Sequence, residues 1–248
     1  MLKDDEMSSQ DLNFVSEMRR RIEAPGDPQI PKILHQIWCG ENPIPGEYWE
    51  LHKTWKKYHP DWDVMFWDDK KIDDLNLVGA KYYKKYPEKT IIKADIARVE
   101  IAWRYGGVYA DHDILYCKSL DPLRKHSFFG VFDMPGRTVE TMCFIFGCKK
   151  GSHIMKSMMD NLSDEGFDPD GDYINFFNHF STYYFNRHVM AHILNNPTAT
   201  VYPAEYLAPF PGENRAELDN GLGALDKYIT PNTYAIHLWR TTWRRQFG

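Results

Sequence analysis

Along the first half of the chain, short continuous apolar runs alternate with segments in which apolar residues recur at helical spacing. Residues 32–38 and 63–67 are β-branched and aromatic runs that predict strands, while 48–58 places Trp and Leu at helical spacing. In 90–105, apolar residues recur every three or four positions, and two glycines end this predicted helix. A strand at 107–111 follows directly. This alternation predicts an α/β domain in which helices cover a sheet.

The second half mixes strands and helices less regularly, which predicts a mixed sheet. We expect strands at 114–117, 127–132, 141–148, 200–202 and 234–238, and helices at 153–162 and 173–195. At the N-terminal end, a helix at 8–23 is followed by the breaker cluster APGDP. We therefore expect an N-terminal helical appendage, 1–29, and a main domain, 30–248.

Composition narrows the class of protein. The 248 residues carry a net charge of −5, which argues against general nucleic-acid binding. The sequence contains no apolar run of membrane-spanning length and no secretory leader, so we expect a cytoplasmic protein or one peripheral to a membrane. Its four cysteines are too few for a disulfide scaffold and lack zinc-site spacing. The 15% of aromatic residues suits packing and also the stacking of sugars or nucleobases.

The segment GGVYADHD at 106–113 carries the candidate chemistry. Its apolar strand delivers Asp111 and Asp113 at i and i+2, so both carboxylates can face one cation. Mg²⁺ and Mn²⁺ prefer oxygen ligands and share their remaining positions with phosphates. A single D-x-D also occurs in ordinary acidic turns. Asp95 and Arg98, at i and i+3 on the preceding helix, form either part of the same site or a surface ion pair.

The run KADIARVEIAWRYGGVYADHD at 93–113 closely resembles the DXD glycosyltransferases of the family-32 type. That group includes yeast initiating α-mannosyltransferases and bacterial capsule and surface-glycan enzymes, and the glucosylating domains of large clostridial toxins are similar more distantly. IPKILHQIWCG at 30–40, DWDVMFWDD at 61–69 and HLWRTTW at 237–243 match further family motifs in the same order. The resemblance covers 30–150 and the tail at 234–243, and is loose between them.

The resemblance implies a GT-A type fold, with a donor-binding half at 30–150 and an acceptor half with a C-terminal tail at 151–248. It implies that Trp38 walls in the donor base and that Trp243 closes over the donor. Asp95 and Arg98 would contact the donor sugar, and Arg98 could also approach the diphosphate. It also implies metal ligands, with Asp113 binding directly and Asp111 shared between donor and metal. His237 would either complete the metal shell or meet the diphosphate. Trp38, His237 and Trp243 also suit core packing. His112 points away from its flanking acids and is not expected to be a ligand.

By the same resemblance, the expected activity is a retaining transfer of a hexose, dependent on Mn²⁺ or Mg²⁺. The donor would be a UDP-hexose or GDP-mannose, and the acceptor a glycan or glycolipid. No catalytic residue is identified; polarity alone suggests Asp172, Asn175 and His179 for the acceptor side. Two alternatives are a magnesium-dependent phosphohydrolase, which also carries D-x-D after an apolar strand, and an inactive carbohydrate-binding protein.

Overall fold

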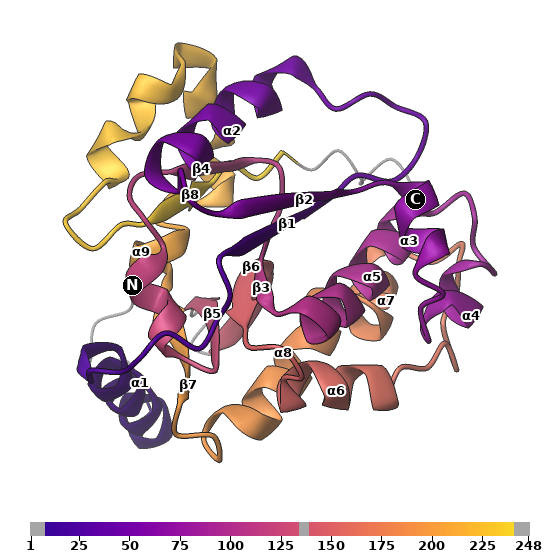
Figure 1. Cartoon of the computed structure of the whole chain (residues 1–248), viewed down its shortest axis with the longest axis horizontal. Helices are drawn as coiled ribbons and strands as arrows, with labels where there is room; N and C mark the ends of the chain where they lie inside the picture. The colour runs from indigo at the N-terminus through magenta and orange to yellow at the C-terminus, as the bar shows by residue number, and fades with distance from the viewer. Residues whose placement is uncertain (1–7, 134–138, 241–248) are drawn as a thin grey trace.

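The computed structural model describes residues 8–133 and 139–240 (Figure 1). The strands are β1 Ile33–Ile37, β2 Asp63–Trp67, β3 Gly107–Ala110, β4 Ile114–Tyr116, β5 Phe128–Asp133, β6 Glu140–Cys148, β7 Ala199–Pro203 and β8 Ala235–His237. The α-helices are α1 Ser9–Glu23, α2 Gly46–Tyr58, α3 Asp69–Asp74, α4 Ala80–Tyr83, α5 Thr90–Tyr105, α6 His153–Asp160, α7 Tyr173–His179, α8 Thr182–Ile193 and α9 Ala204–Leu207. The described residues also form the 3-10 helices η2 Asp121–Lys125, η4 Gly212–Asn220 and η5 Leu222–Tyr228. Within the described ranges, none of the helices combines the length and apolarity needed to cross a bilayer.

A six-stranded mixed sheet forms the centre of the molecule, in the order β2-β1-β3-β6-β5-β7. Strands β2, β1 and β3 are parallel, β6 runs antiparallel to both β3 and β5, and β7 is parallel to β5. The mixed sheet predicted from the sequence is therefore confirmed. Strands β4 and β8 pair separately as a small antiparallel sheet, which joins a segment near the middle of the chain to one near its end.

The central sheet is covered on both faces (Figure 1). One face packs against α5, α6 and α8, in a core that includes Ile101, Tyr109 and Phe146. The other face packs beneath α2 and the small sheet, in a core that includes Leu34 and Trp55. Burial on both faces explains why β3 is a continuous apolar run rather than an alternating one.

Helix α1 packs at the β7 edge of the sheet. Phe14 and Met18 are buried in the same core as the main sheet, with the Phe14 ring 5.7 Å from that of Phe132. The buried Arg21 guanidinium donates hydrogen bonds to main-chain carbonyls that follow or end α8, those of Ile193, Leu194, Asn196 and Ala199. These bonds satisfy carbonyls that the helix end leaves without intrahelical partners.

The structure differs from the sequence prediction in two places that bear on the site. Residues 173–195, expected as one helix, form α7 and α8, because Phe180 and Ser181 leave the helical conformation and Phe180 turns into the core. The strand expected at 107–111 ends at Ala110, so Asp111 and Asp113 lie in a turn rather than in a regular strand. The short helices α3 and α4 were not predicted; each is too short to show a helical period.

Candidate active site

The turn between β3 and β4 carries the two candidate acids. It is fixed from both sides: the Asp111 N–H donates to the Phe144 carbonyl at 2.8 Å, and the Leu238 N–H donates to the Asp113 carbonyl at 3.0 Å. The β4–β8 ladder pairs Ile114 with His237, which brings a residue near the end of the chain beside the turn. The small sheet therefore assembles a site from two distant segments.

Asp111, Asp113 and His237 form a group that could hold a metal ion, with one potential ligand atom from each within 4.8 Å of the others. His237 Nε2 lies 3.2 Å from Asp113 Oδ1. The His237 ring stacks on Phe144 at 4.1 Å between centroids, which fixes its orientation. Two carboxylates and an imidazole suit Mn²⁺ well and Mg²⁺ acceptably. The geometry thus brings together the three residues expected to bind metal.

The two carboxylates ionise differently. Burial opposes the ionisation of Asp113, but the neighbouring His237 and the hydrogen bond from the Arg240 N–H outweigh it and lower the Asp113 pKa. Burial raises the Asp111 pKa, Arg98 opposes that rise, and the Asp113 charge adds to it. Two carboxylates this close repel each other, and a divalent cation between them would remove the repulsion.

Arg98 lies behind Asp111 and is already engaged by protein groups. It forms an ion pair with Asp95, its Nη1 donates to the Cys143 carbonyl at 3.0 Å, and Nη1 lies 3.9 Å from Asp111 Oδ1. Its guanidinium also covers the ring of Tyr109, whose hydroxyl donates to Asp111 Oδ1 at 2.6 Å. Arg98 and Tyr109 together hold the Asp111 carboxylate in place.

The side chains of Asp95 and Arg98 are only 2% and 5% exposed. The two residues line a narrow cavity with Phe180 and Ser181, at the turn between α7 and α8. Arg98 approaches Asp111 from within the core, and the contact of Asp95 and Arg98 with a donor sugar stays a prediction. Asp95 and Arg98 therefore do not form the surface ion pair that was the other possibility at that spacing.

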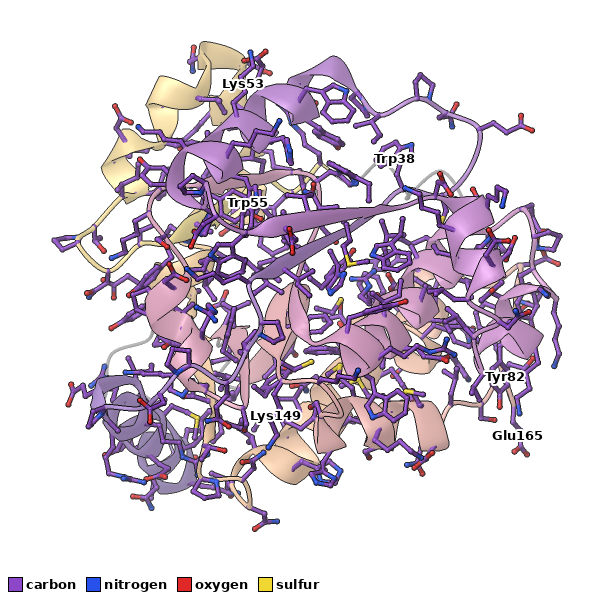
Figure 2. The ribbon with its side chains drawn as sticks, viewed as in Figure 1. Trp38, Lys53, Trp55, Tyr82, Lys149 and Glu165 are labelled. Atoms are coloured by element: carbon purple, nitrogen blue, oxygen red, sulfur yellow. The ribbon has the colours of Figure 1, made fainter. Side chains whose placement is uncertain are left out.

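Trp38 lies where β1 and β2 end, as Figure 2 shows. Its indole N–H donates to the Asn42 carbonyl at 2.6 Å, and its ring meets those of Tyr48 and His112 edge-on at 5.9 and 5.5 Å. The His112 ring is stacked with Tyr48 and Phe66, away from the metal-ligand group, and hydrogen-bonds to the Ile37 backbone. His112 thus connects the turn bearing the acids to the strand end that carries Trp38.

The segment after β8 reaches the site through its main chain. The Arg240 N–H donates to Asp113 Oδ2 at 2.7 Å. Sequence reasoning did not identify Arg240 or Tyr109; for Tyr109 the signal was its place two residues before Asp111, on the same side of the strand. Trp243, expected to close over the donor, lies outside the described residues.

The residues suggested for the acceptor side lie on or beside α7. The Asp172 carboxylate accepts from the Asn175 N–H at 3.0 Å and so caps this helix. His179 hydrogen-bonds to the Asn175 carbonyl at 2.8 Å. These contacts give Asp172 and His179 local structural roles.

Comparison with known proteins agrees with this site. Residues 45–129 match the family model of the glycosyltransferase sugar-binding region containing the DXD motif, and Asp111 and Asp113 fall within that range. This range is similar to the sugar-binding region of DXD-containing glycosyltransferases. Inositol phosphoceramide mannosyltransferase 1 of Schizosaccharomyces pombe is 34% identical over 125 residues, which cover 46% of this chain and 38% of that enzyme. A glycosyltransferase of Acanthamoeba polyphaga mimivirus is 28% identical over 188 residues, 73% of each chain.

Solved glycosyltransferase structures show that the chain has the GT-A fold. The PaToxG glycosyltransferase superposes with a TM-score of 0.56 at 16% identity, covering 75% of this chain and 77% of that one. The UDP-bound glycosyltransferase domain of the YGT toxin gives a TM-score of 0.50 at 10% identity, covering 71% and 80%. The expected fold class is therefore confirmed. The matched region spans well under half the length of the first yeast relatives, 38% and 27%.

Proposed function

We propose that this protein transfers a hexose from a nucleoside-diphosphate sugar to a hydroxyl of a glycan or glycolipid, in a reaction that requires Mn²⁺ or Mg²⁺. The observation that carries the proposal is the convergence of Asp111, Asp113 and His237 at the end of β3. The family match and the fold favour this transferase over a phosphohydrolase or an inactive carbohydrate-binding protein.

The three side chains would hold the metal, whose chemistry is to neutralise the diphosphate as it leaves the sugar. Asp113 is kept ionised by His237 and by the Arg240 N–H, so it is ready to act as an anionic ligand. Arg98 and Tyr109 keep one oxygen of Asp111 fixed, which orients the carboxylate before any ligand arrives. Such preorganisation avoids the free-energy cost of ordering charged groups during the reaction.

The identity of the donor is proposed as a UDP-hexose or GDP-mannose. Relatives named as mannosyltransferases support a mannose donor, and the UDP-bound toxin domain with the same fold supports a uridine nucleotide. Trp38, at the end of β1, is proposed to wall in the base, since a flat ring beside the site can stack on either nucleobase. We further propose, from the family resemblance, that the anomeric configuration is retained.

Donor turnover tests the proposal. The purified protein is incubated with UDP-glucose, UDP-galactose or GDP-mannose and Mn²⁺, and released nucleoside diphosphate is measured. We expect slow hydrolysis of one donor, lost in EDTA and reduced at least about 100-fold by Asp113→Asn, because the substitution removes a charge aimed at the metal.

Asp74→Asn is the matched control, since that aspartate is 64% exposed and lies on α3, apart from the metal-ligand group. It should leave donor hydrolysis unchanged. Phosphatase activity on simple phosphate esters without preference for any sugar nucleotide would contradict the proposed function.

A further inference from the structure

Among the residues that the structure describes, two arginines contact the carboxylates of the metal-ligand group, and they differ in exposure. Arg98 approaches Asp111 but is 5% exposed and bound to Asp95 and the Cys143 carbonyl. Arg240 touches Asp113 through its main-chain N–H, while its side chain is 35% exposed. Of these two, only Arg240 carries a positive charge that a ligand arriving from solvent could reach.

The backbone that places Arg240 is unusual. Trp239 has a φ of +56°, a left-handed conformation that non-glycine residues rarely adopt. The conformation is held by the indole N–H of Trp239, which donates to the Phe210 carbonyl at 2.7 Å, and by Arg215, which donates to the Trp239 carbonyl at 3.3 Å. The turn at Trp239 directs the Arg240 N–H onto Asp113 Oδ2. The main chain of Arg240 is therefore hydrogen-bonded to a carboxylate of the metal-ligand group.

The guanidinium of Arg240 is aimed by an acid on another element. Its Nη2 lies 3.3 Å from Glu47 Oε2, on the first turn of α2. The Glu47 side chain is 54% exposed, so this pair is a weak surface contact that orients the guanidinium without burying it. A guanidinium has five N–H donors, and a single contact at this distance leaves most of them able to bind a ligand.

The electrostatics of donor binding favour a second cation at this place. A divalent metal is largely offset by the two carboxylates, whereas the diphosphate of a sugar nucleotide brings further negative charge. Because phosphate oxygens would occupy coordination positions left by the protein, the diphosphate must lie next to Asp113. Arg240 is attached to that same carboxylate, and a guanidinium matches two phosphate oxygens at once.

We propose that Arg240 is a donor-binding residue whose guanidinium contacts the diphosphate, with Glu47 holding it beside the site. This inference rests on the proposed function, because it assumes a nucleoside-diphosphate donor. It assigns diphosphate recognition to the tail after β8, in addition to the metal.

The test compares ligands with and without phosphates. Affinities for UDP and GDP in Mn²⁺ are measured by calorimetry, and those for uridine and guanosine by saturation-transfer NMR. For Arg240→Gln we expect nucleoside-diphosphate affinity to fall about tenfold or more, since charge-assisted hydrogen bonds are lost. Nucleoside affinity should stay unchanged, and Arg240→Lys should recover part of the loss because it keeps the charge.

Arg187→Gln, on α8, is the matched control and should bind both ligand classes as the unaltered protein does. Equal loss for diphosphate and nucleoside would show that Arg240 only supports the fold of the tail, and unchanged diphosphate affinity would likewise overturn the inference. If the unaltered protein binds neither UDP nor GDP with Mn²⁺, the proposed function itself fails. This measurement on the unaltered protein separates failure of the proposed function from failure of the inference about Arg240.

Discussion

Asp111 and Asp113 are separated by one residue but have different surroundings and therefore different tasks. Asp113 is buried between His237 and the Arg240 N–H, which favour its charged form. Asp111 is partly exposed and is held by Tyr109 and Arg98. Asp113 thus suits a permanently ionised metal ligand, and Asp111 suits a ligand that also meets the donor.

Buried neutral histidines give the fold a defined pH dependence. Burial lowers the pKa of His35, His59 and His126 to about 4 in each case. At His35 the reason is visible: Nε2 bonds to the Gly106 carbonyl, while Nδ1 accepts the Trp67 indole N–H at 3.2 Å, so a second ring proton has no place. An unfolded chain binds these protons near pH 6.5, so proton uptake favours unfolding below that value.

We therefore expect the free energy of unfolding to be fully retained above pH 6.5 and to fall progressively towards pH 4, by up to roughly 3 kcal/mol per histidine. Urea unfolding at pH 7.5, 6.0 and 5.0 measures this fall in the free energy of unfolding. Since carboxylates contribute in the same direction, His35→Gln serves as the comparison: its stability should change less steeply with pH. Identical slopes for the two proteins would show that His35 does not titrate as described.

At the scale of elements, the connection from α5 to β3 decides where the acids are delivered. Gly107 has a φ of +103°, and a Cβ there would lie 2.7 Å from the Ile33 carbonyl oxygen of the neighbouring strand. Only glycine permits both this conformation and this approach. Because β3 pairs with β1 directly beyond this point, the glycine positions the strand that leads into Asp111.

Gly107→Ala should therefore destabilise the protein by about 2–4 kcal/mol, through backbone strain and the clash with β1. Chemical denaturation measures the change. Gly46→Ala, at the start of α2 where an added Cβ meets nothing within 4 Å, is the control and should be neutral or slightly stabilising. Similar stabilities for the two variants would mean that the turn adapts to a side chain.

Elements with a strong local pattern could be predicted from the sequence alone. The strand at 63–67 and the helix at 90–105 have the predicted bounds, because an apolar run and a helical period each signal their own structure. The break between α7 and α8 could not be predicted, since no glycine or proline marks it and the core position of Phe180 causes it. Tertiary contacts decided that boundary.

At the scale of the whole molecule, the site depends on contacts between distant segments. The acids and His237 were predicted as metal ligands from family motifs, but the β4–β8 pairing that joins them is a long-range contact. The burial of Arg98 beneath α8 and the bond from Arg240 to Asp113 depend equally on tertiary structure. Local sequence patterns contain no information about such contacts, which is why these two features were not predicted.

Metal-dependent nucleotide binding tests the central claim most directly. Thermal unfolding is followed with UDP or GDP at about 100 times its dissociation constant, with Mn²⁺ or with EDTA, for the unaltered protein and for Asp113→Asn. We predict that one nucleotide raises the melting temperature by roughly 5–10 °C only with Mn²⁺, since binding at that excess contributes about 2.7 kcal/mol. Asp113→Asn should lose this shift while remaining folded. An equal shift in EDTA, or a full shift in Asp113→Asn, would contradict a metal site formed by Asp111, Asp113 and His237.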